Sequence, residues 1–390
     1  MNTTKLSLML FLAWMASGLL AQAQKEETRL FGRLLVDGAF WDRGADGVAQ
    51  GEVSHGVLLR DVRLGATSAH GPWRAKVEAA LTHNRLSLTD VFVSYDFAKN
   101  HSLRFGNALV PFGLLSMYGT LNKDYMEDPL PNVFQPYRRI GITHTYHTSA
   151  LWLQYGLFAD RMALRGPATG GVEPGWMSGG RLVWRPIVSD GLSLHGGVSG
   201  LYVRPELTPD RNARQVAYHS TYLTAVDGRK ALSLLLPDAQ HEAKGTAEAL
   251  VLYKNLKLTS QLYYSNVWRK DHKCYATHGL YVIGAAQIFN PGNYVYNRAK
   301  SGANLPGPNS LELTLGYGYL NLRDKRGQES PLVGMEQAGV MQDFTLGLSY
   351  YCTKQVAIRA NYHHFLIDAG ATATALRHQN VLQARLQYRF

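Results

Sequence analysis

The sequence is short of charged residues and of long apolar runs. Charged residues make up 18% of its 390 residues, below the ~25% of an ordinary soluble domain. Beyond the N-terminus no apolar run reaches the ~20 residues of a membrane helix, and the mean hydropathy is −0.18, which excludes a helical membrane protein. The hydrophobic fraction of 46% excludes a disordered chain. A large soluble fold and a membrane β-barrel, whose strands alternate apolar and polar residues, both remain possible.

The N-terminus has the three parts of a secretory signal peptide. Lys5 supplies a basic residue, residues 6–20 are apolar, and residues 21–23 (Ala-Gln-Ala) form a small-residue cleavage site. The sequence therefore predicts a signal peptide over residues 1–23 and an exported mature chain over residues 24–390. The net charge of +11 fits an anionic membrane surface or an anion pathway. Export argues against a nucleic-acid partner.

The C-terminal segment alternates between two kinds of side chain. One face carries Leu382, Ala384, Leu386, Tyr388 and Phe390, and the other carries mainly Gln and Arg. Such alternation is typical of a strand with one face toward lipid. A soluble edge strand would alternate too, but a chain that ends on Phe with only one lipid-compatible face favours a membrane β-barrel.

The same alternation, punctuated by turn residues, recurs along the mature chain and predicts sixteen strands. They cover 28–41, 55–68, 72–82, 87–97, 101–107, 139–147, 150–160, 178–187, 191–204, 245–254, 256–269, 275–289, 309–322, 342–352, 355–368 and 379–390. If the C-terminus is periplasmic, the tight connections all fall at the periplasmic end and the long ones outside, as in transmembrane barrels. The expected fold class is all-β, a 16-stranded antiparallel transmembrane β-barrel, which is wide enough for an aqueous channel.

One connection, residues 290–308, does not fit this rule. It is long, yet it falls at the periplasmic end. Either a strand is miscounted or the segment folds elsewhere, for example into the lumen. The residues alone leave both interpretations open.

Cysteine is scarce, with only Cys274 and Cys352 and no C-x-x-C motif. In an oxidising compartment a disulfide would be the default. The predicted topology puts the two residues at opposite ends of the barrel, about a membrane thickness apart, against a limit of ~7 Å between the Cα atoms of a disulfide. We therefore predict two free thiols.

Alternation also assigns charged residues to the lumen. The inward basic residues are expected to be Arg33, Arg63, Arg74, Lys76, Arg104, Arg139, Arg181, Arg185, Lys257, Arg359, Arg385 and Arg389. The inward acidic residues are expected to be Asp37, Asp61, Glu78, Asp90, Asp96, Glu248 and Glu312. This excess of cations predicts an anion pathway, because rows of Arg and Lys attract anions without trapping them. The alternative is that the charges pair with one another and only solvate the interior.

Three motifs resemble the phosphate-selective porin O/P family. They are LRFGNALVPFG from Leu103, MEDPLPN from Met126 and PYRRIG from Pro136, and the similarity extends over essentially the whole mature chain. The resemblance implies a homotrimer of 16-stranded barrels in the outer membrane of a Gram-negative bacterium. It also implies inward-folded loops: two outer loops and one long periplasmic turn narrow the lumen. The segments at these places are 108–138, 205–244 and 290–308.

The resemblance indicates where the constriction should be. The family's arginine pair falls on Arg60 and Asp61, so an acid replaces one arginine. Arg60 has the lipid-facing parity of its strand and needs a bulge or the strand mouth to reach the lumen. The family's third-loop serine pair falls on Gly119 and Thr120.

The basic residues of the third loop are better preserved, as Lys123 and Arg138 or Arg139, and Asp90 matches an acid that orients an arginine. The residues predicted to line the pore or bind anions are Arg33, Arg60, Arg63, Arg74, Lys76, Asp90, Lys123, Arg138, Arg139, Arg181, Arg185 and Arg359.

The predicted function is passive diffusion of small anions, phosphate or similar, through a porin embedded in outer-membrane lipid. Because Asp61 departs from the family pattern, a general small-solute porin is an equal alternative. An outer-membrane enzyme is less favoured, since the sequence has no G-x-S-x-G or H-E-x-x-H motif. An adhesin is less favoured because residues 231–237 of the long outer loop are too apolar for an exposed tip. No cofactor and no metal site are expected.

Overall fold

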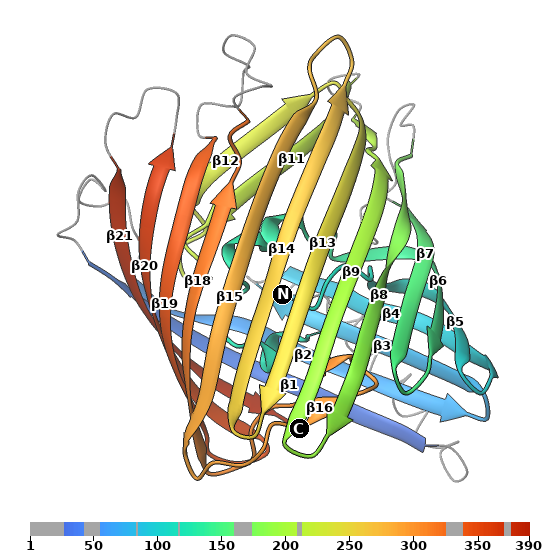
Figure 1. Cartoon of the computed structure of the whole chain (residues 1–390), viewed down its shortest axis with the longest axis vertical. Coiled ribbons are helices and arrows are strands. Elements are labelled where there is room, and N and C mark those ends of the chain that lie inside the picture. The colour runs from blue at the N-terminus through green and yellow to red at the C-terminus, as the bar shows by residue number, and fades with distance from the viewer. Residues whose placement is uncertain are drawn as a thin grey trace, which may run out of the picture.

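The computed structural model describes residues 27–42, 55–82, 85–115, 118–159, 174–208, 213–324, 338–369 and 376–390. The predicted signal peptide, residues 1–23, lies outside these ranges. Long strands dominate the described chain and wrap into one barrel (Figure 1). Among the described residues no helix has the length and apolar character to cross a membrane.

In the described part of the chain, sixteen strands form a closed antiparallel barrel. They are β1 (Glu27–Trp41), β2 (Gly56–His70), β3 (Trp73–Thr82), β4 (Arg85–Ala98), β5 (His101–Leu109), β6 (Arg138–His147), β7 (Leu151–Ala159), β8 (Trp176–Ser189), β9 (Leu192–Arg204), β13 (Ala239–Tyr253), β14 (Leu256–Arg269), β15 (Tyr275–Phe289), β18 (Ser310–Asn321), β19 (Gly339–Tyr351), β20 (Val356–Ala369) and β21 (Arg377–Arg389). β21 closes the barrel on β1, with Leu34 opposite Tyr388 and Phe40 opposite Leu382. Each segment expected from alternation corresponds to one of these strands, which confirms the predicted fold class.

The two faces of each strand differ as period two requires. In β21, Arg385 is 1% exposed on the lumen side, whereas Leu382 and Leu386 are 54% and 50% exposed on the outer face. In β8, Arg181 is buried while Leu182 and Trp184 face outward. An apolar outer belt is what a bilayer requires, and the polar inner face explains the low mean hydropathy of the chain.

The turns β2–β3, β4–β5, β6–β7, β8–β9, β13–β14 and β19–β20 are tight and lie at one end of the barrel, which also holds one long connection, residues 290–309. Gly71 and Gly191 have φ of +54° and +80° in two of the tight turns, in the left-handed region that favours glycine. The tight-turn end is the periplasmic end of such barrels. Cys274, between β14 and β15, and Cys352, between β19 and β20, lie at opposite ends, and both are free cysteines. The prediction of two free thiols is confirmed.

Three connections fold into the barrel. The third loop (residues 110–137) carries the short 3-10 helices η2 (Thr120–Asn122) and η3 (Leu130–Phe134). The fifth loop (residues 205–238) carries a small sheet of β10 (Leu207–Thr208), β11 (Ala213–Thr221) and β12 (Lys230–Pro237). The long turn (residues 290–309) carries β16 (Tyr296–Asn297) and β17 (Gly302–Ala303).

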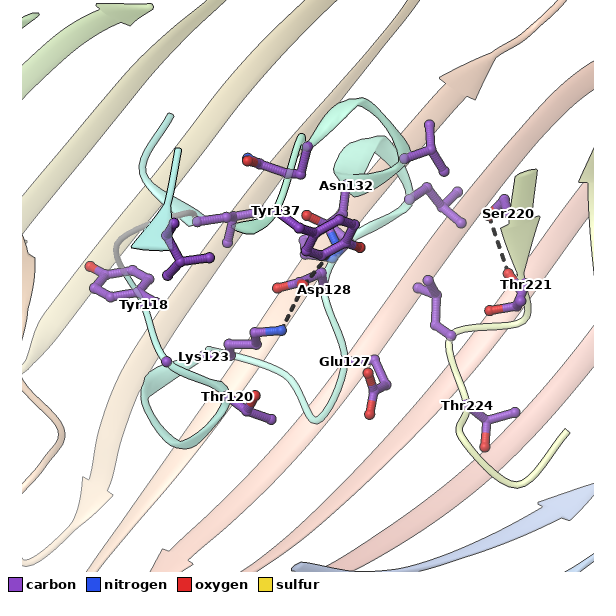
Figure 2. A pocket seen from close by; sticks show the side chains of 18 of the residues that line it. Tyr118, Thr120, Lys123, Glu127, Asp128, Asn132, Tyr137, Ser220, Thr221 and Thr224 are labelled. Carbon is purple, nitrogen blue, oxygen red and sulfur yellow. Dashed lines mark hydrogen bonds and ion pairs between the residues drawn. The ribbon is translucent and has the colours of Figure 1, made fainter. Parts of the chain in front are cut away.

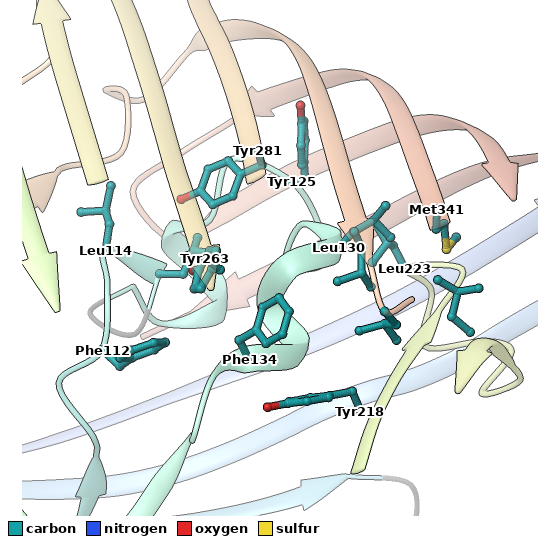
Figure 3. Close-up of a cluster of buried hydrophobic side chains, with 14 of the residues drawn as sticks. Phe112, Leu114, Tyr125, Leu130, Phe134, Tyr218, Leu223, Tyr263, Tyr281 and Met341 are labelled. Carbon is teal, nitrogen blue, oxygen red and sulfur yellow. The ribbon is translucent and has the colours of Figure 1, made fainter. Parts of the chain in front are cut away.

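The hydrophobic core lies in the lumen, between these connections and the wall (Figure 3). The ring of Phe134 in the third loop lies 5.2 Å from that of Tyr218 in the fifth loop and 6.0 Å from that of Tyr263 in β14, centroid to centroid. Leu130 packs into the same cluster. Burying each such side chain contributes roughly 1.5–3 kcal/mol. The inward folding implied by the family resemblance is confirmed for both loops.

Glycines leave room for the third loop to lie directly on the wall. A Cβ on Gly316 of β18 would overlap the hydroxyl of Tyr125, and one on Gly113 would overlap the side-chain amide of Gln261. Gly113 also has φ of +77°. A side chain at Gly316 would displace Tyr125 from the wall, and one at Gly113 would displace the amide of Gln261 and strain the backbone, so this close approach favours glycine at both positions.

The long turn also lies in the lumen. The amide of Ala303 donates to the hydroxyl of Tyr118 at 2.7 Å, which joins the long turn to the third loop. Arg185 of β8 donates to the carbonyl oxygen of Arg298 at 2.7 Å. Of the two interpretations left open by the sequence, folding into the lumen is therefore the one observed.

Candidate functional site

A cavity of about 390 Å³ lies where the third and fifth loops meet the wall, and we call it the constriction cavity (Figure 2). The third loop contributes Lys123, Glu127 and Asp128, among others. The wall contributes basic residues of β2 and β6, and the fifth loop contributes hydroxyl side chains. The polar residues that line it are Arg60, Arg63, Tyr118, Thr120, Lys123, Glu127, Asp128, Asn132, Gln135, Tyr137, Arg138, His219, Ser220, Thr221 and Thr224.

Arg60 reaches this cavity because β2 has a bulge. Leu35 of β1 lies opposite Asp61, while the next residue of β1, Val36, lies opposite Leu59, so Arg60 is the extra residue. An extra residue re-aims its side chain relative to strict alternation. The guanidinium of Arg60 donates to the carboxylate of Glu127 through Nε at 2.9 Å and Nη2 at 3.1 Å. The bulge that alternation required for Arg60 is therefore present.

Glu127 joins the third loop to two parts of the wall. Besides Arg60, it accepts a hydrogen bond from Nη2 of Arg385 at 2.8 Å. Arg385 in turn donates to Asp37 at 2.7 and 2.6 Å. Burial favours the neutral acid, but the charge of Arg60 and its hydrogen bonds outweigh burial and lower the pKa of Glu127 to about 2. Glu127 is thus a carboxylate at physiological pH.

Asp61 stands where the family pattern has its second arginine. It therefore contributes a carboxylate, which lies between two other arginines, and not a second positive charge. It accepts hydrogen bonds from Nε of Arg33 and Nε of Arg63, both at 3.0 Å. Arg63 also donates to Glu78 at 2.7 Å, and Arg33 donates to the hydroxyl of Thr120 at 3.1 Å. The acid in the family's arginine pair therefore neutralises part of the cationic wall and helps to position the third loop.

A second acid, Asp90, organises the neighbouring wall. Its two oxygens lie 2.5 Å from Nζ of Lys76 and 2.5 Å from Nε of Arg138. Asp90 thus holds an arginine, as the resemblance implies. In the third loop Lys123 pairs with Asp128 at 2.6 Å. Each arginine and lysine that lines the constriction cavity is therefore paired with a carboxylate, so the charge pairing considered in the sequence analysis is present here.

Four of the twelve predicted residues line the cavity: Arg60, Arg63, Lys123 and Arg138. Arg74 and Arg139 are among the other eight. Arg74 pairs with Asp96 at 3.0 Å, and these side chains are 62% and 36% exposed, close to the periplasmic turns. Nη1 of Arg139 donates to the carbonyl oxygen of Arg138 at 2.9 Å. Arg33 and Lys76 lie behind the lining, where they pair with Asp61 and Asp90, the acids that also hold Arg63 and Arg138.

Arg181 and Arg185 face the lumen as predicted, but they lie beneath the long turn. Nε of Arg181 donates to Glu248 at 3.0 Å, and Nε2 of His195 lies 2.8 Å from the same carboxylate oxygen. Arg185 is 2% exposed and donates to the carbonyl of Arg298. The geometry makes these two arginines anchors for the long turn.

Arg359 is an anchor for the third loop. It is 1% exposed, and its Nη2 donates to the carbonyl oxygens of Lys123 and Asp124 at 2.8 and 2.7 Å. Asp124 also pairs with Nζ of Lys257 at 2.6 Å. Alternation correctly placed Arg359 on the lumen face, although its donors are directed at loop backbone.

Sequence reasoning missed the acids of the third loop and the hydroxyl side chains of the fifth loop. Glu127 and Asp128 stand in the MEDPLPN motif, which was identified for its resemblance but not for its charge. Ser220, Thr221 and Thr224 come from a segment whose path through the lumen has no local signature.

A family model described as phosphate-selective porin O and P matches residues 40–390. The chain belongs to this family. It has the closed barrel and the inward-folded third loop that the resemblance to this family implied, and its place is the outer membrane of a Gram-negative bacterium.

Relatives of this porin are distant in sequence. An uncharacterised protein of Caulobacter vibrioides is 24% identical over 318 residues, which cover 75% of this chain and 61% of that relative's length. OmpT of Vibrio cholerae has a TM-score of 0.58 at 12% identity, covering 94% of this chain and 98% of that one. An anion-selective porin from Comamonas acidovorans has a TM-score of 0.57 at 14% identity, covering 94% and 100%. At these identities the likeness shows the fold.

Proposed function

We propose that this porin lets small anions diffuse passively down their gradient through the constriction cavity. The observation that carries the proposal is the set of basic residues around the cavity: Arg60, Arg63 and Arg138 from the wall and Lys123 from the third loop. The family description as phosphate-selective and the anion-selective porin from Comamonas acidovorans support an anionic solute.

The paired charges define how such a channel works. Guanidinium groups carry five N–H donors, and the bonds of Arg60 to Glu127 use Nε and Nη2, which leaves Nη1 for a passing ion. An anion exchanges hydration for several partial contacts in turn, and the nearby carboxylates keep each contact weak enough for release. No covalent chemistry or cofactor is part of this proposal, and it describes a channel rather than an enzyme.

The experiment is a reversal-potential measurement in planar bilayers across a KCl gradient. We expect the reversal potential to have the sign produced by a pore that passes chloride more readily than potassium. Arg60→Gln should reduce that selectivity, because it removes a basic side chain from the cavity and leaves Glu127 less compensated. Cation selectivity of the native protein, or no conductance, would overturn the proposal.

A general small-solute porin is the second candidate. The observation that favours it is Asp61, whose carboxylate takes hydrogen bonds from both Arg33 and Arg63. A conducting pore whose reversal potential stays near zero would favour this function over the first.

We further propose that the porin assembles as a homotrimer in outer-membrane lipid and that residues 1–23 are removed on export. The trimer form of Vibrio cholerae OmpT, with a TM-score of 0.58, supports the assembly. Native mass spectrometry of the detergent-solubilised protein would measure both the number of subunits and the mass of the mature chain.

A further inference from the structure

The two sides of the constriction cavity differ in chemistry (Figure 2). The wall and the third loop present ion pairs, such as Lys123 with Asp128 at 2.6 Å. The fifth loop presents the hydroxyl groups of Ser220, Thr221 and Thr224. A solute in this cavity therefore meets ion pairs on the side of the wall and third loop, together with neutral groups such as Thr120 and Asn132, and meets hydroxyl groups beside His219 on the side of the fifth loop.

The charged side is poorly suited to a bare polyvalent anion. Arg60 shares its charge with Glu127, Arg63 with Asp61 and Glu78, and Arg138 with Asp90. Removing a small, strongly hydrated anion from water requires compensation by several positive charges that are not already neutralised. A singly charged carboxylate needs less compensation, because one or two remaining N–H donors suffice.

The size of the cavity also favours a solute larger than a bare inorganic anion. A volume of about 390 Å³ is many times the ~30 Å³ that one water molecule occupies in the liquid. It falls within the range of roughly 300–1,000 Å³ that holds small organic ligands. A bare inorganic anion would leave most of this space, including the hydroxyl side, to water.

From these three observations we propose that the preferred solutes are organic monoanions that carry several hydroxyl groups, such as sugar acids, rather than inorganic phosphate. The inference rests on the proposed function and names its substrate class. The carboxylate faces the arginines of the wall, while the hydroxyl groups of the solute exchange hydrogen bonds with Thr221 and Thr224 of the fifth loop.

The test is inhibition of the chloride current by three added anions in planar bilayers at neutral pH. Gluconate carries a carboxylate and a chain of hydroxyl groups, and hexanoate has a carboxylate without hydroxyl groups. Inorganic phosphate is a compact anion without a carboxylate or a carbon chain. We expect gluconate to half-block the current at a concentration about tenfold or more below the other two, since each neutral hydrogen bond contributes about fivefold. Stronger block by phosphate, or equal block by gluconate and hexanoate, would overturn the inference.

Two variants locate the effect. Thr221→Val keeps the shape of the side chain but removes its hydroxyl, so it should weaken gluconate block about fivefold while hexanoate block changes little. Ser233→Ala removes a hydroxyl from β12 of the same loop, outside the cavity lining, and should leave gluconate block at the native value. Equal losses in both variants would contradict the assignment to Thr221.

Measuring the reversal potential together with the block distinguishes a failure of this inference from a failure of the proposed function. A chloride-selective pore that phosphate blocks best would overturn the sugar-acid inference and leave the anion porin intact. A cation-selective or closed pore would overturn both.

Discussion

An arginine–glutamate ion pair occurs on each of two opposite sides of the lumen, and the two pairs have different roles. Beside the constriction cavity, the side chains of Arg60 and Glu127 are 21% and 16% exposed. Across the barrel, between β8 and β13, Arg181 and Glu248 are both fully buried under the long turn. The first pair borders water and a solute path, whereas the second is enclosed by protein.

The difference shows that exposure, and not the type of residue, decides what a lumen arginine does. An enclosed pair interacts strongly but has no contact with a passing ion, so its effect is to hold the long turn in place. A pair at the edge of water is screened and keeps donors available to a solute. Four predictions test this comparison, from the largest expected effect to the smallest.

Glu248→Gln should give the largest effect. It leaves Arg181 charged and enclosed without its carboxylate, and breaking such a pair costs about 3–5 kcal/mol. We expect the free energy of unfolding to fall by this amount in urea titrations of the refolded protein, and the long turn to loosen, which raises single-channel conductance.

The matched control is Glu27→Gln. Glu27 pairs with Arg29 at the start of β1, where the two side chains are 63% and 74% exposed. If Glu248→Gln has the same free energy of unfolding as the native protein, or if Glu27→Gln lowers that free energy by the same amount, burial does not distinguish the two kinds of pair.

Glu127→Gln should change selectivity more than stability. It removes one negative charge beside the cavity and leaves Arg60 uncompensated, while Arg385 keeps its pair with Asp37. We expect the ratio of chloride to potassium permeability to rise about fivefold, which corresponds to the ~1 kcal/mol between two charges a few ångströms apart in water. Reversal potentials in a KCl gradient measure it, and a shift toward potassium would contradict the placement of Glu127 beside the path.

The same carboxylate predicts a pH dependence. Burial would raise the pKa of Glu127, but the charge of Arg60 and its hydrogen bonds lower it from the ordinary 4.5 to about 2 in the folded protein. A lowered pKa means that the stability contributed by Glu127 is complete above about pH 4.5 and is lost as the pH falls through about 2. We expect chloride selectivity to stay constant down to about pH 4 and to rise near pH 2, a step that Glu127→Gln should lack.

Lys76→Gln and Arg74→Gln should differ in their effect on ion selectivity, although the two residues are close in sequence. Lys76 holds Asp90 beside the lining, so neutralising it should shift the reversal potential toward cations. Arg74 is paired at an exposed position near the turns, and exposed pairs contribute little. We expect Arg74→Gln to change the permeability ratio by less than about twofold. The double variant should therefore resemble Lys76→Gln alone, and an equal effect of the two single variants would contradict this assignment.

The strands and their faces could be predicted from the sequence because alternation is a local property. Leu382 and Arg385 reveal their faces through their immediate neighbours, and the sixteen strands follow from the same rule. The position of Arg60 could be predicted only in part. Alternation indicated that Arg60 needs a bulge or the strand mouth to reach the lumen, but only the pairing of β1 with β2 shows that a bulge is present.

The role of each lumen arginine could not be predicted in this way. Arg63 and Arg181 have the same parity and similar neighbours along their strands, yet one borders the cavity and the other lies under the long turn. What separates them is the path of segments far away in the sequence, and no local pattern records that path.

By itself the sequence determined a chain of alternating strands with a polar, mostly basic inner face, because side-chain direction in a strand depends only on adjacent residues. Tertiary structure decided which of those basic residues meet solute. Asp124, Glu127 and Asp128 are brought to the wall by a loop that crosses the lumen, and Thr221 is brought there by another. A pair between segments far apart in the sequence, such as Arg60 with Glu127, exists only once the barrel has closed and the loops have folded into it.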